Sequence, residues 1–221
     1  MNNSEQPAIA KPFGWDFVQR ILRFLLPFLF RMDVRGIEHL PDRGPAIITP
    51  NHVSWFDVIF MAAYNKVPPV TFAAEKWNKV PVINSLLRHF GQAIFVNRGA
   101  PDKQALTAAL RALRAGRVLG VAPEGTRSHD GVLQKGHDGA AWLASRTDAL
   151  IIPVAVWGHE DVIAGHWLRL RRPHIHFYVG EPFRLPPEAR ATRSRELKPY
   201  TEMIMHRIAA MLPPERRGPY G

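Results

Sequence analysis

The sequence predicts an α/β domain with a mixed, largely parallel β-sheet flanked by helices. Its 221 residues, 46% of them apolar, are enough for one domain with a sizeable core. Short apolar runs alternate with helical patterns at residues 45–49, 58–64, 70–73, 93–96, 105–115, 118–122, 137–145, 150–156 and 175–179. Such alternation of strands and helices is typical of parallel sheets. Polar residues follow several predicted strands, where enzymes of this architecture place their sites.

The most apolar region, residues 13–30, predicts an amphipathic helix. An apolar stripe recurs at helical spacing at Phe17, Ile21, Leu25 and Leu29. Charged residues and Pro27 interrupt the region, so it lacks the roughly 18 uncharged residues of a spanning helix, and it does not resemble a secretory signal. Such a helix suits a membrane interface, but a helix that covers the protein's own core has the same pattern.

The first predicted strand, residues 45–49, leads into a His-x4-Asp pattern formed by His52 and Asp57. Five positions of a regular helix turn a side chain by about 140°, so this pair needs a strand-to-helix turn to meet. Ser54, three residues before Asp57, predicts the N-cap of the next helix and places His52 in the turn. Taken alone, the pattern also fits a capping box beside an ordinary turn histidine.

Three later strands carry further candidates. Arg98 follows the strand at 93–96, and a carboxylate, a glycine, a hydroxyl and an arginine follow the strand at 118–122 in the order Glu124, Gly125, Thr126 and Arg127. The strand at 150–156 contains Pro153, which predicts an edge strand or a bulge. Beyond it, the sequence predicts one helix at 198–212 and a loose end at 213–221.

Composition limits the chemistry. There is no cysteine, which excludes disulfides, thiolate nucleophiles and cysteine-bound metals. A formal charge of +10 favours anionic partners such as phospholipid head groups, coenzyme A phosphates, acidic carrier proteins or nucleic acid. No metal and no cofactor are predicted, because none of the candidate histidine ligands falls in a metal-binding spacing; these are His137, His159, His166, His174 and His176.

Together these segments closely resemble the glycerolipid acyltransferase family, the PlsC-like 1-acylglycerol-3-phosphate acyltransferases, over residues 35–180. All four family blocks occur in order. His52 and Asp57 match the catalytic pair of the first block, Arg98 the arginine of the second, residues 124–127 the Glu-Gly-Thr-Arg block, and Pro153 the fourth. The chain departs from the commonest pattern at Asn97, at Ala122 and in the less apolar segment 135–139.

The resemblance implies a role for each matching residue. His52 would take the proton of the attacking hydroxyl, and Asp57 would hold the imidazole in the right tautomer. Arg98 and Arg127 are expected to bind the acceptor phosphate, and Glu124 to orient an arginine or accept an acceptor hydroxyl. The other expected substrate-binding residues are Asn51, Ser54, Gly125, Thr126 and Pro153. No covalent intermediate is required.

The resemblance further implies an N-terminal docking element of two helices, which residues 13–30 would supply as two short helices broken at Pro27. The predicted organisation is therefore a docking element (residues 1–34), an acyltransferase domain (35–212) and a loose tail (213–221). The predicted reaction moves an acyl group from acyl-CoA or acyl-carrier protein to a lysophospholipid, with lysophosphatidic acid favoured as acceptor. The predicted location is the anionic cytoplasmic face of the cell membrane, as a peripheral or monotopic protein.

Three alternatives remain open at this stage. A different lysolipid could be the acceptor, or the chain could bind acyl lipids without turnover. A nucleic-acid binder would rest on basic charge alone, and the sequence has no groove-reading or aromatic-basic motif, so nucleic acid is not a predicted partner.

Overall fold

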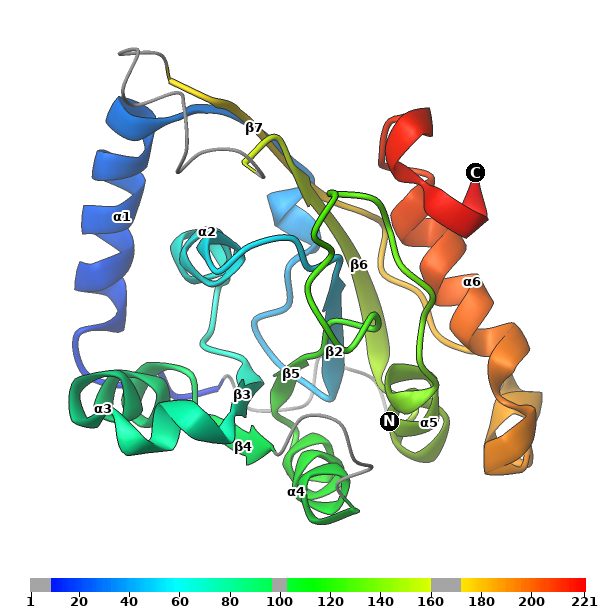
Figure 1. Ribbon diagram of the computed structural model, residues 1–221. Helices are drawn as coiled ribbons and strands as arrows, with labels where there is room; N and C mark the ends of the chain where they lie inside the picture. The colour runs from blue at the N-terminus through cyan, green and yellow to red at the C-terminus, as the bar shows by residue number, and fades with distance from the viewer. Residues whose placement is uncertain (1–8, 97–102, 160–171) are drawn as a thin grey trace.

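The computed structural model describes residues 9–96, 103–159 and 172–221 (Figure 1). In these residues seven strands form one sheet, in the order β1-β7-β6-β2-β5-β3-β4. The strands are β1 (Arg31–Arg35), β2 (Ala46–Pro50), β3 (Val70–Ala74), β4 (Ile94–Val96), β5 (Val118–Gly120), β6 (Leu150–Trp157) and β7 (His174–Val179). The helices are α1 (Trp15–Leu29), α2 (Phe56–Tyr64), α3 (Pro81–Phe90), α4 (Lys103–Arg114), α5 (Gly139–Thr147) and α6 (Lys198–Ala209).

The sheet is mixed and largely parallel, which confirms the predicted fold class. β6 and β7 pair antiparallel, whereas the other neighbouring strands pair parallel. Parallel strands place their carboxyl ends at one edge of the sheet. The segments that follow β2 and β5 therefore lie close together, although about 70 residues separate them.

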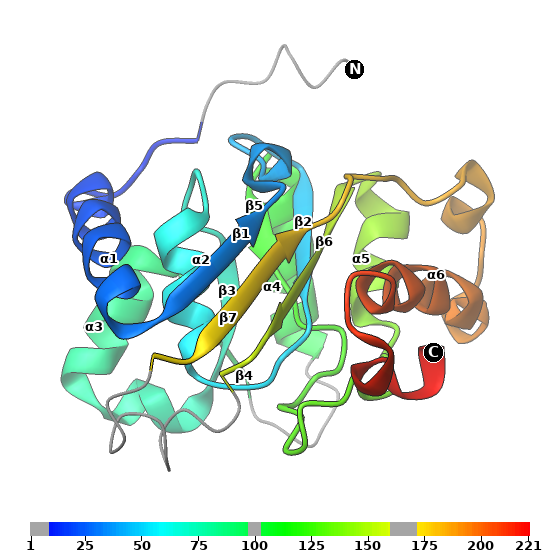
Figure 2. The same cartoon turned by 90° about the horizontal axis from the view of Figure 1, so that it is seen from above.

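Helices cover the two faces of the sheet (Figure 2). Neighbouring residues on β2 point to opposite faces. Ile47 belongs to the core that packs under α4, α5 and α6, where Leu113 and Leu143 are fully buried. Ile48 belongs to the core under α1 and α2, with Phe30 and Phe60. The two apolar cores therefore pack on opposite faces of β2, and the end of β2 carries the His-x4-Asp turn.

β6 is an interior strand, because it lies between β7 and β2. Of the two alternatives predicted at Pro153, the edge strand is therefore wrong, whereas the irregular pairing beside this proline fits a bulge. Pro153 accepts a hydrogen bond from the Gly180 amide just beyond β7, and Ile151 pairs again at an isolated bridge with Phe183. Between the end of β7 and that bridge, the outer chain has one residue more than β6. This bulge is where a residue without an N–H is tolerated.

Both ends of the domain differ from the sequence-based expectation. α1 is one helix that continues across Pro27, not two short ones, and the strand at 31–35 joins the sheet. The final residues are not loose, because they form short 3₁₀ turns that bind the loop before α5. The Tyr220 hydroxyl accepts the Gly136 amide, and the Arg216 carbonyl accepts the Leu133 amide.

Candidate active site

The turn between β2 and α2 brings His52 and Asp57 together, as expected. His52 Nδ1 lies 2.8 Å from Asp57 Oδ2. An ionised carboxylate only accepts hydrogen bonds, so Nδ1 carries a proton and donates it to Asp57. The lone pair of His52 then resides on Nε2. A base with its orienting carboxylate is the result.

Asp57 also organises the backbone of the turn. Its Oδ2 accepts the amides of Val53 at 2.9 Å and Ser54 at 3.0 Å. Ser54 Oγ accepts the Phe56 amide at 3.3 Å, while Trp55 occupies the N-cap position expected for Ser54. Asp57 thus caps the start of α2 and also contacts the imidazole of His52, so the capping interpretation and the base–carboxylate interpretation of the His-x4-Asp pattern are compatible.

A second histidine, His159, binds the other oxygen of Asp57. His159 Nε2 lies 2.5 Å from Asp57 Oδ1, and both side chains are buried. Sequence reasoning considered His159 only as a metal ligand. The two residues are 102 positions apart, so no local spacing could have indicated this contact.

Both carboxylate oxygens of Glu124 bind backbone amides. Its carboxylate is 1% exposed, and Oε1 accepts the His52 amide at 2.7 Å while Oε2 accepts the Gln134 amide at 2.7 Å. The expectation that Glu124 orients an arginine or accepts an acceptor hydroxyl differs from this geometry. Glu124 instead joins the histidine turn to the 124–134 loop.

The pKa values of the two buried carboxylates are shifted in opposite directions. Burial raises the pKa of Asp57, but the hydrogen bonds from His159 and His52 together lower it by more, so the net pKa lies below its usual range. Burial raises the pKa of Glu124, and the backbone amides of Gln134 and His52 offset this only in part. Two imidazole donors therefore favour the ionised form more than two backbone amides do.

The turn after β5 lies directly against His52. The Ser128 amide donates to the His52 carbonyl at 2.7 Å. Gly125 adopts a left-handed φ of +68°, and a Cβ there would come within 3.1 Å of His137 Cδ2. Thr126 and Arg127 are exposed in this turn, and within the described residues Arg127 has no carboxylate within salt-bridge distance.

The remaining predicted site residues have different surroundings. Asn51 is buried and exchanges two hydrogen bonds with the backbone of Val156, so it links β2 to β6. Pro153 is buried in β6. Ser54 helps to cap α2. Arg98 and its neighbour Asn97 lie outside the described residues.

Of the other candidate histidine ligands, His137 lies beside Gly125, and its amide donates to the Pro123 carbonyl. His174 and His176 lie side by side on β7, where His176 contacts Asp33 of β1. In the parts of the chain that the structure describes, no group of three or more potential ligands could hold a metal ion. His166 lies outside those parts.

Comparison with known proteins assigns the chain to a family. The acyltransferase family profile matches residues 31–157, more than half of the chain, and spans the His52–Asp57 turn and the Glu124 turn. The chain belongs to the acyltransferase family. It is 31% identical over 130 residues to a 1-acyl-sn-glycerol-3-phosphate acyltransferase of Borreliella burgdorferi, covering 58% of this chain and 52% of that protein.

Two other relatives match over greater lengths. A 1-acyl-sn-glycerol-3-phosphate acyltransferase of Bacillus subtilis is 26% identical over 88% of this chain and 94% of its own length. A lyso-ornithine lipid O-acyltransferase of Pseudomonas aeruginosa is 26% identical over 87% of this chain and 81% of its own. By contrast, the chain spans only about half the length of the Borreliella relative.

The fold also matches a solved structure. The crystal structure of the 1-acyl-sn-glycerophosphate (LPA) acyltransferase PlsC from Thermotoga maritima superimposes with a TM-score of 0.67 at 24% identity, over 86% of this chain and 76% of that one. This match supports the α/β architecture.

Proposed function

We propose that this acyltransferase moves a fatty acyl group from an acyl thioester to the free hydroxyl of a lysophospholipid, with lysophosphatidic acid as acceptor and phosphatidic acid as product. The observation that carries the proposal is the 2.8 Å contact between His52 Nδ1 and Asp57 Oδ2 at the carboxyl end of β2. The similarity to the Borreliella and Bacillus proteins, both named 1-acyl-sn-glycerol-3-phosphate acyltransferase, supports this choice of acceptor.

In this mechanism His52 is the general base. Its Nε2 removes the proton of the acceptor hydroxyl as the oxygen attacks the thioester carbonyl carbon. The tetrahedral intermediate collapses with cleavage of the carbon–sulfur bond, and the proton passes from His52 to the departing thiolate. Asp57 stabilises the imidazolium that forms between these steps. The acyl group goes directly to the acceptor, without a covalent enzyme intermediate.

The acceptor phosphate would bind arginine. Arg127 is exposed on the turn whose Ser128 amide binds the His52 carbonyl, so an arginine side chain that is accessible to an anion starts one residue from that contact. Arg98 is proposed for the same role from its match to the second family block. A guanidinium fork binds two phosphate oxygens at once, which lysine does not reproduce.

The donor and the acceptor head group are separate choices within this proposal. Acyl-CoA and acyl-carrier protein both present an anionic carrier to a protein of formal charge +10. The similarity to a lyso-ornithine lipid O-acyltransferase, over 87% of this chain, favours an ornithine lysolipid as the second candidate acceptor.

The activity test pairs palmitoyl-CoA with lysophosphatidic acid in detergent micelles, and follows thiol release and phosphatidic acid together. Wild-type protein should form both products, and His52→Ala should lose about 10²- to 10⁴-fold of the rate, the usual contribution of a positioned base. Thiol release without acceptor would indicate a thioesterase instead. Binding of acyl lipid together with equal rates of product formation for wild type and His52→Ala would refute the proposed enzymatic activity.

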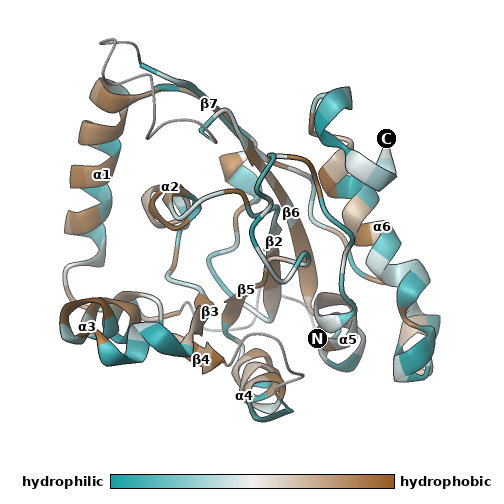
Figure 3. Cartoon of the chain, in the orientation of Figure 1, coloured by the Kyte–Doolittle hydropathy of each residue, from teal (hydrophilic) through white to brown (hydrophobic). Residues whose placement is uncertain are grey.

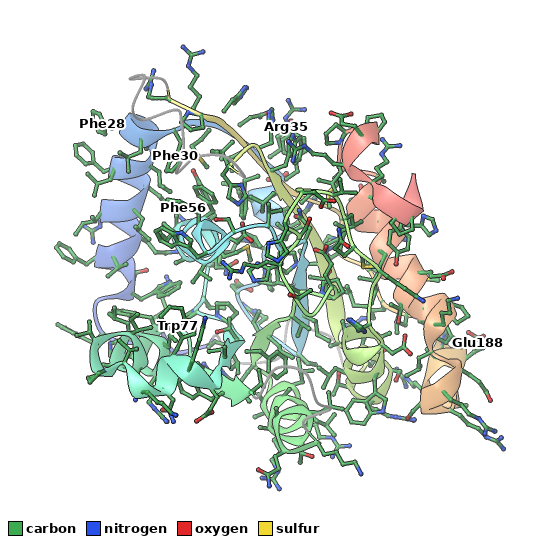
Figure 4. All side chains as sticks on the ribbon, viewed as in Figure 1. Phe28, Phe30, Arg35, Phe56, Trp77 and Glu188 are labelled. Carbon is green, nitrogen blue, oxygen red and sulfur yellow. The ribbon has the colours of Figure 1, made fainter. Side chains whose placement is uncertain are left out.

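We propose further that the protein acts at the cytoplasmic face of the cell membrane as a peripheral or monotopic protein, with residues 1–34 as the docking element and residues 35–212 as the catalytic domain. The predicted apolar stripe of α1 faces outward (Figure 3), and Phe24 and Phe28 are 67% and 64% exposed. Figure 4 shows Phe28 on the outer side of α1 and Phe30 on its inner side. None of the described helices has the length and apolar content to span a bilayer.

α3 extends this apolar surface. Val82 and Leu86 are exposed on it, and Trp77 lies on the 3₁₀ turn just before it. The contact between Trp15 and Phe90, with ring centroids 6.2 Å apart, joins α1 to α3. Exposed apolar side chains on two adjoining helices suit an interfacial position, with the basic charge attracting anionic lipid.

Vesicle sedimentation tests this docking. The double variant Phe24→Ser/Phe28→Ser should bind phosphatidylglycerol vesicles more weakly than wild type. Because both rings are exposed, the variant should fold normally. Ile37→Ser removes an exposed apolar side chain away from α1 and serves as the matched control. Equal binding of all three proteins would refute docking through α1.

A further inference from the structure

His159 is a buried titratable residue that the proposed proton transfer does not use. It lies two residues after the end of β6, and its side chain has a solvent exposure of 0%. Its Nε2 is 2.5 Å from Asp57 Oδ1, on the side of the carboxylate opposite to His52. Asp57 therefore lies between two imidazoles.

The backbone and the packing both fix this ring. Gly158, just before it, has a φ of +95°, and a Cβ there would come within 2.0 Å of the His174 carbonyl oxygen. Only glycine allows the chain to turn at this point. The imidazole then packs edge-on against Phe60 of α2, with centroids 5.3 Å apart and planes at 88°. Phe60 is three residues after Asp57, so the same helix face contacts the ring twice.

The hydrogen bonds of Asp57 indicate what the His159–Asp57 contact does. Oδ2 accepts from His52 and from two backbone amides, whereas Oδ1 accepts from His159. The carboxylate only accepts, so His159 Nε2 carries the proton. His159 Nδ1 is buried without a hydrogen-bond partner among the described residues. Among the described residues, Asp57 is thus the hydrogen-bond partner of this imidazole. A side chain present only for packing would not need such a hydrogen bond.

We propose that His159 is a positioning residue for the general base. By donating Nε2–H to Oδ1, it prevents the Asp57 carboxylate from rotating and keeps Oδ2 directed at His52 Nδ1. The inference rests on the proposed function, because it assigns His159 to the same base. His159 acts through Asp57 and contacts no reacting atom.

Two substitutions by amide side chains distinguish the effect of the hydrogen-bond donor from the effect of the imidazole ring. In His159→Gln, the side-chain amide nitrogen reaches approximately the position of Nε2, so the hydrogen bond to Oδ1 is retained. In His159→Asn, the amide is one methylene shorter and falls at the position of Nδ1. We expect His159→Asn to lower kcat on the order of tenfold, the equivalent of one charge-assisted hydrogen bond, with KM unchanged. His159→Gln should stay near wild type.

The outcomes decide the inference. A kcat for His159→Asn equal to wild type would overturn it, and so would equal losses in His159→Gln and His159→Asn, because the ring and not the donor would then matter. Thermal unfolding shows which variants fold. If His159→Asn does not fold, His159→Phe takes its place, since it retains a ring against Phe60 and lacks the donor.

A spectroscopic measurement makes the result independent of turnover. In ¹⁵N-histidine-labelled protein, the proton on His52 Nδ1 should give a low-field resonance typical of a strong hydrogen bond to a carboxylate. We expect this resonance in wild type and His159→Gln, and an upfield shift or loss in His159→Asn. An unchanged resonance in His159→Asn would overturn the inference. A wild type with this resonance but no transfer of acyl groups would refute the proposed function alone.

Discussion

The turn before α2 and the turn after β5 each bury a carboxylate against His52, yet the two carboxylates have opposite properties. Asp57 binds the imidazole ring of His52, and its pKa is lowered. Glu124 binds the backbone amide of the same residue, and its pKa is raised. Both are almost fully buried, so burial alone does not explain the difference.

The difference arises from the donors. Asp57 accepts from two imidazoles as well as two amides, and an imidazole favours the carboxylate charge by its hydrogen bond and, when protonated, by its charge. Glu124 accepts from two backbone amides, which leave burial as the larger effect. Asp57 is therefore suited to remain ionised beside a developing imidazolium, while Glu124 is suited to hold two loops together.

Truncation of Asp57 should have the largest effect on catalysis. Asp57→Ala removes the acceptor of His52 Nδ1, so the imidazole loses both its tautomer preference and its counter-ion. We expect kcat to fall by about 10²- to 10⁴-fold, as for the loss of an orienting carboxylate in other base-assisted acyl transfers. Steady-state kinetics with palmitoyl-CoA measure it. A fall of less than about tenfold would mean that Asp57 only caps α2.

Truncation of Glu124 should affect stability more than chemistry. Glu124→Ala leaves the buried amides of His52 and Gln134 without acceptors, at a cost of roughly 1–3 kcal/mol each in the free energy of unfolding. Urea unfolding gives this value, and the loss in kcat should be smaller than for Asp57→Ala. Glu181→Ala, at an exposed glutamate, is the control. A larger catalytic loss in Glu124→Ala than in Asp57→Ala would reverse the roles of the two carboxylates.

The two carboxylates should also give opposite pH dependence of stability. The pKa of Asp57 in the folded protein is below its ordinary 3.8, so its contribution is complete above that pH and is lost as the pH falls. The pKa of Glu124 is above its ordinary 4.5, so its contribution is complete below pH 4.5 and is lost as the pH rises through the folded value.

Urea unfolding across this pH range measures both contributions. The difference in free energy of unfolding between wild type and Asp57→Ala should shrink below pH 3.8. The difference between wild type and Glu124→Ala should instead grow as the pH is lowered from neutrality towards 4.5. Parallel curves for the two variants would contradict the opposite pKa shifts.

The smallest expected effect concerns the backbone of the turn after β5. Gly125→Ala places a Cβ on a residue with φ of +68°, within 3.1 Å of His137 Cδ2. A left-handed conformation costs a residue with a Cβ about 1–2 kcal/mol, so the thermal midpoint should fall slightly. Gly139→Ala is the matched control, because a Cβ there meets nothing within 4 Å. Equal midpoints would show that the turn relaxes to accept a Cβ.

Local patterns predicted much of the fold and part of the site. The spacing of His52 and Asp57 and the alternation of apolar segments are properties of neighbouring residues, and the structure has a strand or helix at each predicted segment. Two elements were missed. β1 is an edge strand that alternates charged and apolar residues over only five positions, which is a weak strand pattern. α3 is amphipathic, but none of its residues is buried, and its apolar side chains Val82 and Leu86 lie on the surface.

The remaining parts of the site depend on contacts between distant residues. Glu124 and His159 contact partners 72 and 102 positions away along the chain, and the sequence contains ten histidines with nothing local to distinguish His159. The resemblance to the family identified Glu124 but not its partners. A glutamate that binds backbone amides cannot be told from one that binds a ligand in the sequence, because the difference lies in its three-dimensional contacts.

The contact between the 3₁₀ turns at 214–220 and the loop before α5 has a consequence for biosynthesis. The Arg216 carbonyl and the Tyr220 hydroxyl bind Leu133 and Gly136, on either side of Gln134, whose amide binds Glu124. These residues are translated more than 80 positions after that loop. During synthesis on the ribosome, the loop behind Glu124 therefore gains these two hydrogen bonds only after residues 216–220 have emerged.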